Sequence, residues 1–506
     1  MMISGKRMKL KLMKMQNTHF GNSVKGRFFS KGKYEKNTKF KEDLYKYHHE
    51  PYVDNVNLRP DLYLKGDDAE EEGEGKDISN GGIKSTHDRR LKRNFPLVYS
   101  NEVENLEELK ANPFTLVNIK TKNNESLGVA TFNPYSLITA RVLSHNALFS
   151  INIHFFIEKI KESLSWRNRI YKEKTNNVAT PVTTDTTDPT LKDDHSYELP
   201  TSDNKYRLLR DDHCYRLLNG EGDGVPGLLI DRYDNFVSVQ HLSVGCEMLA
   251  CNINDALIEL LNPEAIIFRN DNKERLNEKL EIYKKVFYGK VPEQVMLKEN
   301  DCFFLIDLLN SPNTGWYFNR KSVRNLLCTY AYKKKVLDLF SYVGSFGIQC
   351  AKIGKAKKVV CVEKQPNFVE LAKKSAYLNG IKNNIEFVCD DFLHFFQNCD
   401  ELFDIIILDP PNLIPKSKFL ESGSKRYTDL IHLAQKYINP NGLLLIIFAT
   451  KLCSYQNYIN IINKSFVHTN KHVKIVGQGR ASPDHPVNLS LYLVSDFYWF
   501  ALQLSY

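Results

Sequence analysis

Long apolar runs and paired cysteines are both missing from this 506-residue sequence. No stretch reaches 18 consecutive apolar residues, so the sequence predicts no membrane-spanning helix and no membrane partner. The ten cysteines are scattered, and none forms a C-x-x-C pair. This pattern argues against a zinc site or a disulfide framework, so we expect no bound metal and a reducing compartment.

Acidic residues are missing from the first 34 positions, which carry nine Lys or Arg. A basic, acid-free leader without an apolar core is typical of an organellar transit peptide. The stretch Arg27-Phe28-Phe29-Ser30 resembles a mitochondrial processing site with cleavage after Phe29. We expect the mitochondrial matrix as the location, with a plastid or the cytoplasm as alternatives. The leader could instead be a basic arm that contacts RNA phosphates.

The length and composition predict several folded parts separated by stretches that are poor in large apolar residues. A chain of 506 residues exceeds one compact core. The net charge of +9 permits a nucleic-acid partner without requiring one. The predicted boundaries are a leader at 1–34, a disordered linker at 35–92, a first folded domain at 93–172, a low-complexity insertion at 173–205, a central domain at 206–310 and a C-terminal domain at 311–506.

Strand and helix patterns alternate through the C-terminal part. Strands are expected at 334–340, 356–363, 384–390, 403–409 and 441–450, helices at 345–354, 366–380, 422–437 and 455–465, and a closing antiparallel strand at 490–502. This alternation predicts an α/β fold with a doubly wound parallel sheet and helices on both faces. Ligands bind such sheets at the carboxyl ends of the strands, where the strand order reverses.

The first strand-to-helix turn, "DLFSYVGSFG", has glycine only at some of the positions that a dinucleotide fingerprint needs. Gly344 would let the backbone approach a ligand, and Gly347 would let the following helix pack closely. Tyr342 stands where the fingerprint requires glycine, so a pyrophosphate is disfavoured.

Acids follow at the ends of three successive strands, at Asp338, Glu363 and Asp390. Glu363 is placed to accept two ribose hydroxyls, and Asp390 to lie near an adenine amino group. Asp338 would face a sulfonium or an ammonium group. One ribose, one adenine and no phosphate describe S-adenosylmethionine. Each acid alone could instead be a solvated turn or a helix cap.

The fourth strand ends in the stretch "FDIIILDPPNLIPKSK" at 403–418. Prolines cannot continue a strand, so the strand stops at Asp409 and a rigid lip follows. The carboxylate of Asp409 and a backbone carbonyl at Pro410 could accept hydrogen bonds from the exocyclic amine of a flipped base. The alternative is a stiff connector without a chemical role.

Several separate stretches, spread over 93–496, resemble one family. They are "FPLVYSNEV" (95–103), "FNPYSLITARVLS" (132–144), "YRLLNGEGDGVPGLLIDRY" (215–233), "TGWYFNRKSVR" (314–324), "VLDLFSYVGSFG" (336–347), "ILDPP" (407–411) and "DHPV" (484–487). Together the chain resembles the bacterial large-subunit ribosomal RNA (cytosine-C5)-methyltransferases that carry an N-terminal PUA domain.

The resemblance implies a domain order, a cofactor and a reaction. A PUA-like β-barrel would bind RNA, a small α+β central domain would follow, and a class I Rossmann-like methyltransferase sheet would use S-adenosylmethionine. The substrate would be a cytosine C5 of large-subunit rRNA, and bacterial members are homodimers. The residues expected to bind the cofactor are Tyr317, Asp338, Phe340, Gly344, Glu363, Asp390 and Asp409.

The catalytic cysteine of that family has no clear counterpart here. In the family it lies in a Phe-Ser-Cys-Ser pattern and adds to cytosine C6. The corresponding stretch reads "FATKLCS", which places Thr450 at the cysteine position. Cys453 would face the same side only if residues 450–454 form a helical turn; otherwise it would be an inert buried cysteine. The candidate catalytic residues are therefore Asp409, Pro410, Thr450 and Cys453.

Three functions remain open from the sequence. The chain could be a 5-methylcytosine enzyme with a relocated thiol, an RNA methyltransferase of other chemistry such as exocyclic nitrogen methylation, or an rRNA-binding assembly factor that methylates nothing. Arg141, Arg216, Arg232 and Lys321 are candidates for phosphate contacts or for structural ion pairs. His485 could shape the rim of the active site or anchor a turn.

Overall fold

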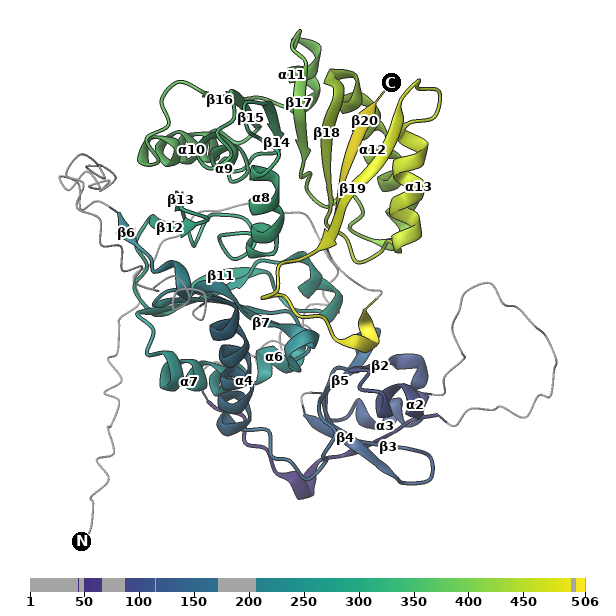
Figure 1. Cartoon of the computed structure of the whole chain (residues 1–506). Coiled ribbons are helices and arrows are strands. Elements are labelled where there is room, and N and C mark those ends of the chain that lie inside the picture. The colour runs from purple at the N-terminus through teal and green to yellow at the C-terminus, as the bar shows by residue number, and fades with distance from the viewer. Residues whose placement is uncertain are drawn as a thin grey trace, which may run out of the picture. The chain divides into compact units, whose positions relative to one another are not determined.

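The structure is a computed structural model that describes residue 44 and residues 50–65, 87–113, 115–171, 206–492 and 497–505. The predicted leader (1–34) and the predicted insertion (173–205) lie outside this part of the chain. A compact unit that spans residues 44–506 holds four β-sheets within its described residues (Figure 1). None of the helices described there is both long enough and apolar enough to cross a membrane.

The first sheet has five strands in the order β1-β3-β4-β5-β2. Its elements are β1 (Asp61–Tyr63), α2 (His87–Lys92), β2 (Leu97–Tyr99), α3 (Leu106–Leu109), β3 (Leu116–Lys120), β4 (Ser126–Phe132) and β5 (Ile138–Ser144). The prediction that residues 35–92 form a disordered linker is wrong for residues 50–65 and 87–92, which the structure describes. β1 pairs in parallel with β3, and Leu62 and Leu64 are buried in the core of this sheet. These two apolar side chains attach the segment to the sheet.

The central part combines a five-stranded sheet, in the order β11-β10-β9-β8-β7, with a three-stranded sheet, in the order β13-β12-β6. Its elements are α4 (Ile153–Tyr171), β6 (Arg207–Leu208), β7 (Cys214–Asn219), β8 (Leu228–Tyr233), β9 (Phe236–His241), α6 (Val244–Met248), α7 (Ala250–Leu261), β10 (Ala265–Asn270), β11 (Tyr283–Gly289), β12 (Val295–Glu299) and β13 (Cys302–Ile306). Helices and mostly antiparallel strands match the predicted α+β class.

The C-terminal sheet has seven strands in the order β16-β15-β14-β17-β18-β20-β19. Its elements are η7 (Phe318–Arg320), α8 (Lys321–Cys328), β14 (Lys335–Leu339), α9 (Gly347–Lys352), β15 (Lys358–Glu363), α10 (Pro366–Leu378), β16 (Ile385–Cys389), α11 (Phe392–Gln397), β17 (Phe403–Leu408), α12 (Leu420–Ala434), β18 (Ile438–Phe448), α13 (Tyr455–Ser465), β19 (His472–Arg480) and β20 (Tyr498–Ser505). Five neighbouring strands pair in parallel, whereas β20 pairs antiparallel with both β18 and β19. The closing strand lies later than the predicted 490–502, and β19 was not predicted.

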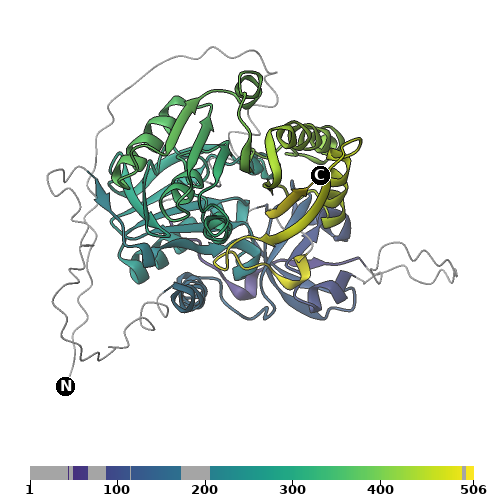
Figure 2. The same cartoon turned by 45° about the horizontal axis from the view of Figure 1, so that its top comes forward.

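Helices cover both faces of this sheet (Figures 1 and 2). In β17, Ile406 and Leu408 pack in the core beneath α11, α12 and α13. Ile405 and Ile407 pack on the opposite face, in the core with α8 and α9. Burial on both faces explains why this strand is apolar at almost every position. Strand order reverses between β14 and β17, because the chain runs outward from β14 through β15 and β16 before it returns to β17.

Candidate active site

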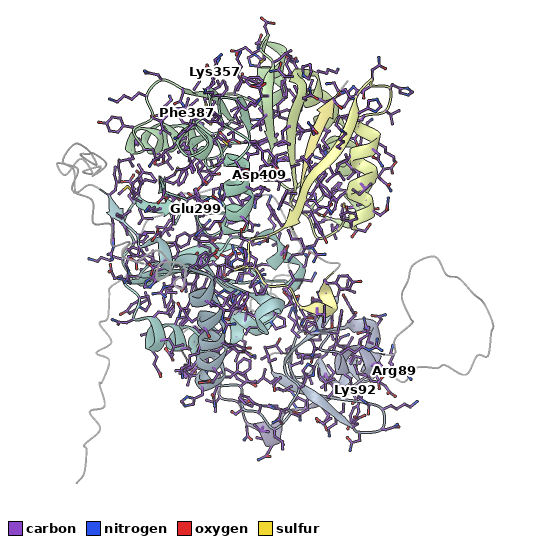
Figure 3. The ribbon with its side chains drawn as sticks, viewed as in Figure 1. Arg89, Lys92, Glu299, Lys357, Phe387 and Asp409 are labelled. Carbon is purple, nitrogen blue, oxygen red and sulfur yellow. The ribbon has the colours of Figure 1, made fainter. Side chains whose placement is uncertain are left out.

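A cavity opens at the carboxyl ends of the strands around this reversal. Phe340 after β14, Glu363 at the end of β15, Asp390 after β16 and Asp409 after β17 all line it, as does Tyr317 from the segment before η7. The structure thus brings together five of the residues predicted from the sequence. Figure 3 labels Asp409 at this place. Cavities at strand-order reversals are the usual ligand sites of open α/β sheets.

The turn between β14 and α9 has an unusual backbone. Phe340, Tyr342 and Gly344 have φ values of +60°, +53° and +73°. The left-handed region costs a non-glycine residue about 1–3 kcal/mol, so contacts around the turn must hold it. The Tyr342 amide donates to Glu363 Oε2 at 3.0 Å, and the Tyr342 hydroxyl donates to the Gly315 carbonyl at 2.9 Å. A strained, well-held turn beside a cavity is typical of a ligand clamp.

Gly347 begins α9 directly against the neighbouring strand. A Cβ at this position would lie 2.3 Å from Cys361 Sγ of β15. No side chain fits at that distance, so only glycine lets α9 start here. The prediction that Gly347 allows close helix packing is confirmed.

Asp338 lies beneath the turn and does not line the cavity. Its side chain is fully buried, and its Oδ2 accepts a hydrogen bond from the Gly347 amide at 2.9 Å. Burial raises the pKa of this carboxyl to about 8. The predicted contact with a sulfonium or ammonium group therefore does not match the geometry. The side chain points under the turn because Asp338 is still inside the strand, one residue before its end.

Glu363 and Asp390 carry the carboxylates at the neighbouring strand ends. Glu363 Oε1 also accepts from the Gln365 amide at 2.9 Å. Asp390 Oδ2 lies 2.6 Å from His394 Nδ1, and this hydrogen bond lowers the pKa of Asp390. Phe392, which the sequence analysis did not select, lines the cavity with its ring centroid 5.1 Å from that of Phe340. The signal that could have found it is an aromatic residue directly after a strand-end acid pair.

Asp409 is held by an arginine from a distant part of the sequence. Arg320 Nε donates to Asp409 Oδ2 and Arg320 Nη2 donates to Asp409 Oδ1, both at 2.8 Å. The two side chains are only 7% and 14% exposed. The Arg320 guanidinium also lies over the Tyr317 ring, 4.4 Å from its centroid. Arg320 lies within the motif at 314–324, but its position in the sequence predicted no role for it.

A buried carboxylate fixes the segment that delivers Arg320. Glu299, at the end of β12, accepts from Trp316 Nε1 at 2.9 Å and from Arg324 Nε at 2.6 Å. All three side chains are buried, and Glu299 is labelled in Figure 3. Tyr317 and Arg320 lie between these two anchors, so the central domain determines their position at the cavity.

Neither residue proposed as the nucleophile is placed for that role. Thr450 Oγ1 donates to the Ile414 carbonyl and accepts from the Leu452 amide, both at 3.2 Å. Cys453 is 3% exposed in the apolar core and does not line the cavity, and burial raises the pKa of its thiol to about 11. The helical turn that a catalytic Cys453 required is absent, because α13 begins only at Tyr455. The prediction of a relocated thiol at Cys453 is wrong.

The four basic candidates for phosphate contacts have partners inside the chain. Arg141 pairs with Glu278 at 2.9 Å, Arg216 pairs with Asp231, and Arg232 donates to the Asp234 carbonyl. Lys321 lies over the Tyr171 ring at 4.3 Å. These contacts support the structural interpretation of the four residues. His485 fits both of its predicted roles, since it lines the cavity and pairs with the buried Asp484 at 2.9 Å.

Comparisons with known proteins agree with this architecture. Residues 83–145 match the family model of a PUA-like domain, and residues 295–433 match the TRM5/TYW2 methyltransferase domain. A ribosomal RNA large subunit methyltransferase I from Cronobacter sakazakii is 29% identical over 406 residues, which are 79% of this chain and 93% of that protein.

Solved structures show the same fold. A candidate SAM-dependent methyltransferase from Streptococcus mutans has a TM-score of 0.64 at 22% identity and covers 88% of this chain and 100% of its own. A second methyltransferase structure, complexed with SAH, has a TM-score of 0.63 at 22% identity and covers 82% of this chain and 97% of its own. The chain thus contains a PUA-like domain and a methyltransferase domain, and over most of its length it is similar to bacterial large-subunit ribosomal RNA methyltransferases.

Proposed function

We propose that this chain transfers a methyl group from S-adenosylmethionine to large-subunit ribosomal RNA. The observation that carries the proposal is the cavity at the strand-order reversal, where Glu363 and Asp390 stand at successive strand ends beside the strained turn. The similarity to bacterial large-subunit rRNA methyltransferases, over most of both chains, supports the RNA substrate.

The residues at the cavity fit an adenosine-containing methyl donor. Glu363 offers carboxylate oxygens for ribose hydroxyls, and the Phe340 and Phe392 rings offer apolar surface to an adenine. At Gly344 a Cβ would touch Ile348 and Phe387, each at 3.2 Å, so the turn is shaped closely around a glycine. When bound, S-adenosylmethionine supplies an electrophilic methyl group on a sulfonium.

The chain's own residues would orient the RNA base. The rigid lip at Asp409 and Pro410 follows β17 and lines the same cavity, whereas Glu363 and Asp390 stand at the ends of β15 and β16, on the other side of β14. Arg320 holds the Asp409 carboxylate in one orientation through two parallel hydrogen bonds, which a single donor could not do. Lys364, Lys416 and Arg426 also line the cavity and bring positive charge that suits RNA phosphates.

A methyl-transfer assay on protein-free large-subunit rRNA, with tritiated donor, tests the proposal. Glu363→Ala should raise the calorimetric Kd of S-adenosylmethionine at least about tenfold, since a hydrogen bond to a charged group is worth roughly 1.5–3 kcal/mol. Glu386→Ala is the matched control, because Glu386 is exposed and does not line the cavity. Equal donor affinity in the two variants, or rRNA that acquires no label, would contradict the proposal.

We also propose that the protein is located in the mitochondrial matrix and forms a homodimer. The acid-free basic leader supports import into the mitochondrial matrix. A homodimer is proposed on the resemblance to the bacterial enzymes, and the molar mass from light scattering during size-exclusion chromatography tests it.

A further inference from the structure

We propose that the methyl acceptor is the exocyclic amino nitrogen of an RNA base, not the C5 carbon of cytosine. The inference rests on the proposed function and specifies the atom that the site methylates. It comes from two independent observations: the cavity offers no thiol, and its proline lip offers only hydrogen-bond acceptors.

No cysteine can reach the cavity to activate C5. Methylation at C5 needs a nucleophile that adds to C6, because the carbon itself is too weakly nucleophilic. All ten cysteines lie in the part of the chain that the structure describes, and none lines the cavity. Cys453, the one nearest in sequence to the expected position, is packed in the apolar core.

Thr450 cannot replace the missing thiol. An activated hydroxyl needs a base within hydrogen-bond reach. The partners of Thr450 Oγ1 among the described residues are the Ile414 carbonyl, which accepts a hydrogen bond from it, and the Leu452 amide, which donates one to it. Neither can remove a proton, so Thr450 supports the loop and does not attack the base.

An exocyclic amine needs no activating adduct, because it brings its own lone pair. The nitrogen lone pair forms the new N–C bond as the C–S bond of the donor breaks and the electron pair stays on sulfur, which leaves S-adenosylhomocysteine. The methylated nitrogen then carries one proton in excess, and the Asp409 carboxylate accepts it. The sum is one amine hydrogen replaced by methyl and one proton released.

The lip at 409–411 is suited to bind an amine, because it presents hydrogen-bond acceptors. Pro410 and Pro411 have no N–H. In the described part of the chain, no hydrogen bond reaches the carbonyl oxygens of Asp409, Pro410 or Pro411. Each Asp409 carboxylate oxygen accepts one bond from Arg320 and keeps further lone-pair capacity. An exocyclic amine, such as the N4 amine of cytosine, offers two N–H donors to these acceptors. Its nitrogen would then lie at the lip, and C5 would lie one ring position away.

A dual-label assay on the full chain separates the two chemistries. Protein-free large-subunit rRNA is transcribed with cytidine tritiated at C5 and incubated with donor labelled with carbon-14 in the methyl group. Transfer to an amine should place carbon-14 in the RNA while less than about a tenth of that amount of tritium is released. Nuclease digestion and mass spectrometry should place the methyl group on an exocyclic nitrogen. RNA containing 5-fluorocytidine should form no denaturant-resistant complex with the protein.

The outcomes distinguish this inference from the proposed function. Tritium release equal to methyl incorporation, a 5-methylcytidine product or a trapped 5-fluorocytidine complex would overturn the inference and leave rRNA methylation intact. No carbon-14 in any RNA would overturn both. Cys453→Ala should keep the transfer rate within about threefold of Cys389→Ala, an exposed cysteine control. A Cys453→Ala variant that melts like the control but transfers no methyl would also refute the inference.

Discussion

Substitution of Asp338 by asparagine tests whether this acid binds the methyl donor or supports the turn. The side chain is buried beneath the turn, where it accepts the Gly347 amide. Asn keeps an acceptor of the same shape, so we expect the Kd of S-adenosylmethionine to change less than about threefold. Ala removes the acceptor and leaves a buried amide unpaired, which costs roughly 1–3 kcal/mol. We expect this loss to loosen the turn and weaken donor binding at least about tenfold.

The raised pKa of Asp338 gives the same substitution a pH signature. The folded chain keeps this proton up to a pKa of about 8, whereas an unfolded aspartate loses it near pH 4. The carboxyl's contribution to stability is therefore complete below pH 4 and falls by about 1.4 kcal/mol per pH unit until the folded group ionises. Asn does not titrate. The stability of Asp338→Asn relative to wild type should thus rise by roughly 2 kcal/mol between pH 6 and pH 8.

Urea unfolding at both pH values, followed by tryptophan fluorescence, measures this difference. Trp499 packs in a core of the C-terminal sheet, and Trp316 packs in a core that the central and C-terminal parts share, so both report on unfolding around this sheet. Asp400→Asn, at an exposed acid, is the control that should show no pH-dependent change. Two results would refute the reasoning: a pH-independent difference between Asp338→Asn and wild type, or a loss of donor binding in Asp338→Asn as large as in Asp338→Ala.

Three other predictions use separate assays. Arg320→Met should lower the rate of methyl transfer at least about a hundredfold with little change in the Kd of S-adenosylmethionine. Arg320→Lys should keep only part of the wild-type rate, since lysine cannot hold both Asp409 oxygens. Equal rates in the two variants would contradict this prediction. Gly347→Ala should cost about 1–3 kcal/mol of stability through its clash with Cys361, and adding Cys361→Ala should recover most of the loss; a fully stable single variant would not fit. Residues 1–34 fused to a fluorescent protein should direct it to mitochondria, whereas a leader with its Lys and Arg changed to Gln should remain in the cytosol.

Local pattern was enough to predict the sheet and most of the cavity lining. The isoleucines of β17 and the prolines after it predicted a buried strand with a stiff end, and β17 is buried on both faces. Glu363 and Asp390 were found because strand ends meet at one edge of a parallel sheet. These inferences need only residue type and position along one strand.

Contacts between distant parts of the sequence could not be predicted in the same way. The partner of Asp409 lies 89 residues earlier, and nothing near Arg320 in the sequence indicates that it reaches β17. β1 was not predicted, because two leucines in a short segment are too weak a pattern to indicate a strand. The orientation of Cys453 depended on where α13 begins, and the side-chain cap of Ser454 determines this.

Strand register, more than residue type, separates the roles of the two aspartates at the centre of the sheet. Asp338 of β14 aligns with Ile407 of β17, so Asp409 lies two residues further along the strand direction. Two residues of extended chain correspond to about 6.6 Å. That distance leaves Asp338 inside the sheet, where a backbone amide is its partner, and carries Asp409 beyond the strand end to the cavity and to Arg320. An acid moved by two positions in either strand would therefore exchange one role for the other, which is why a strand-end acid cannot be assigned to a ligand from its sequence position alone.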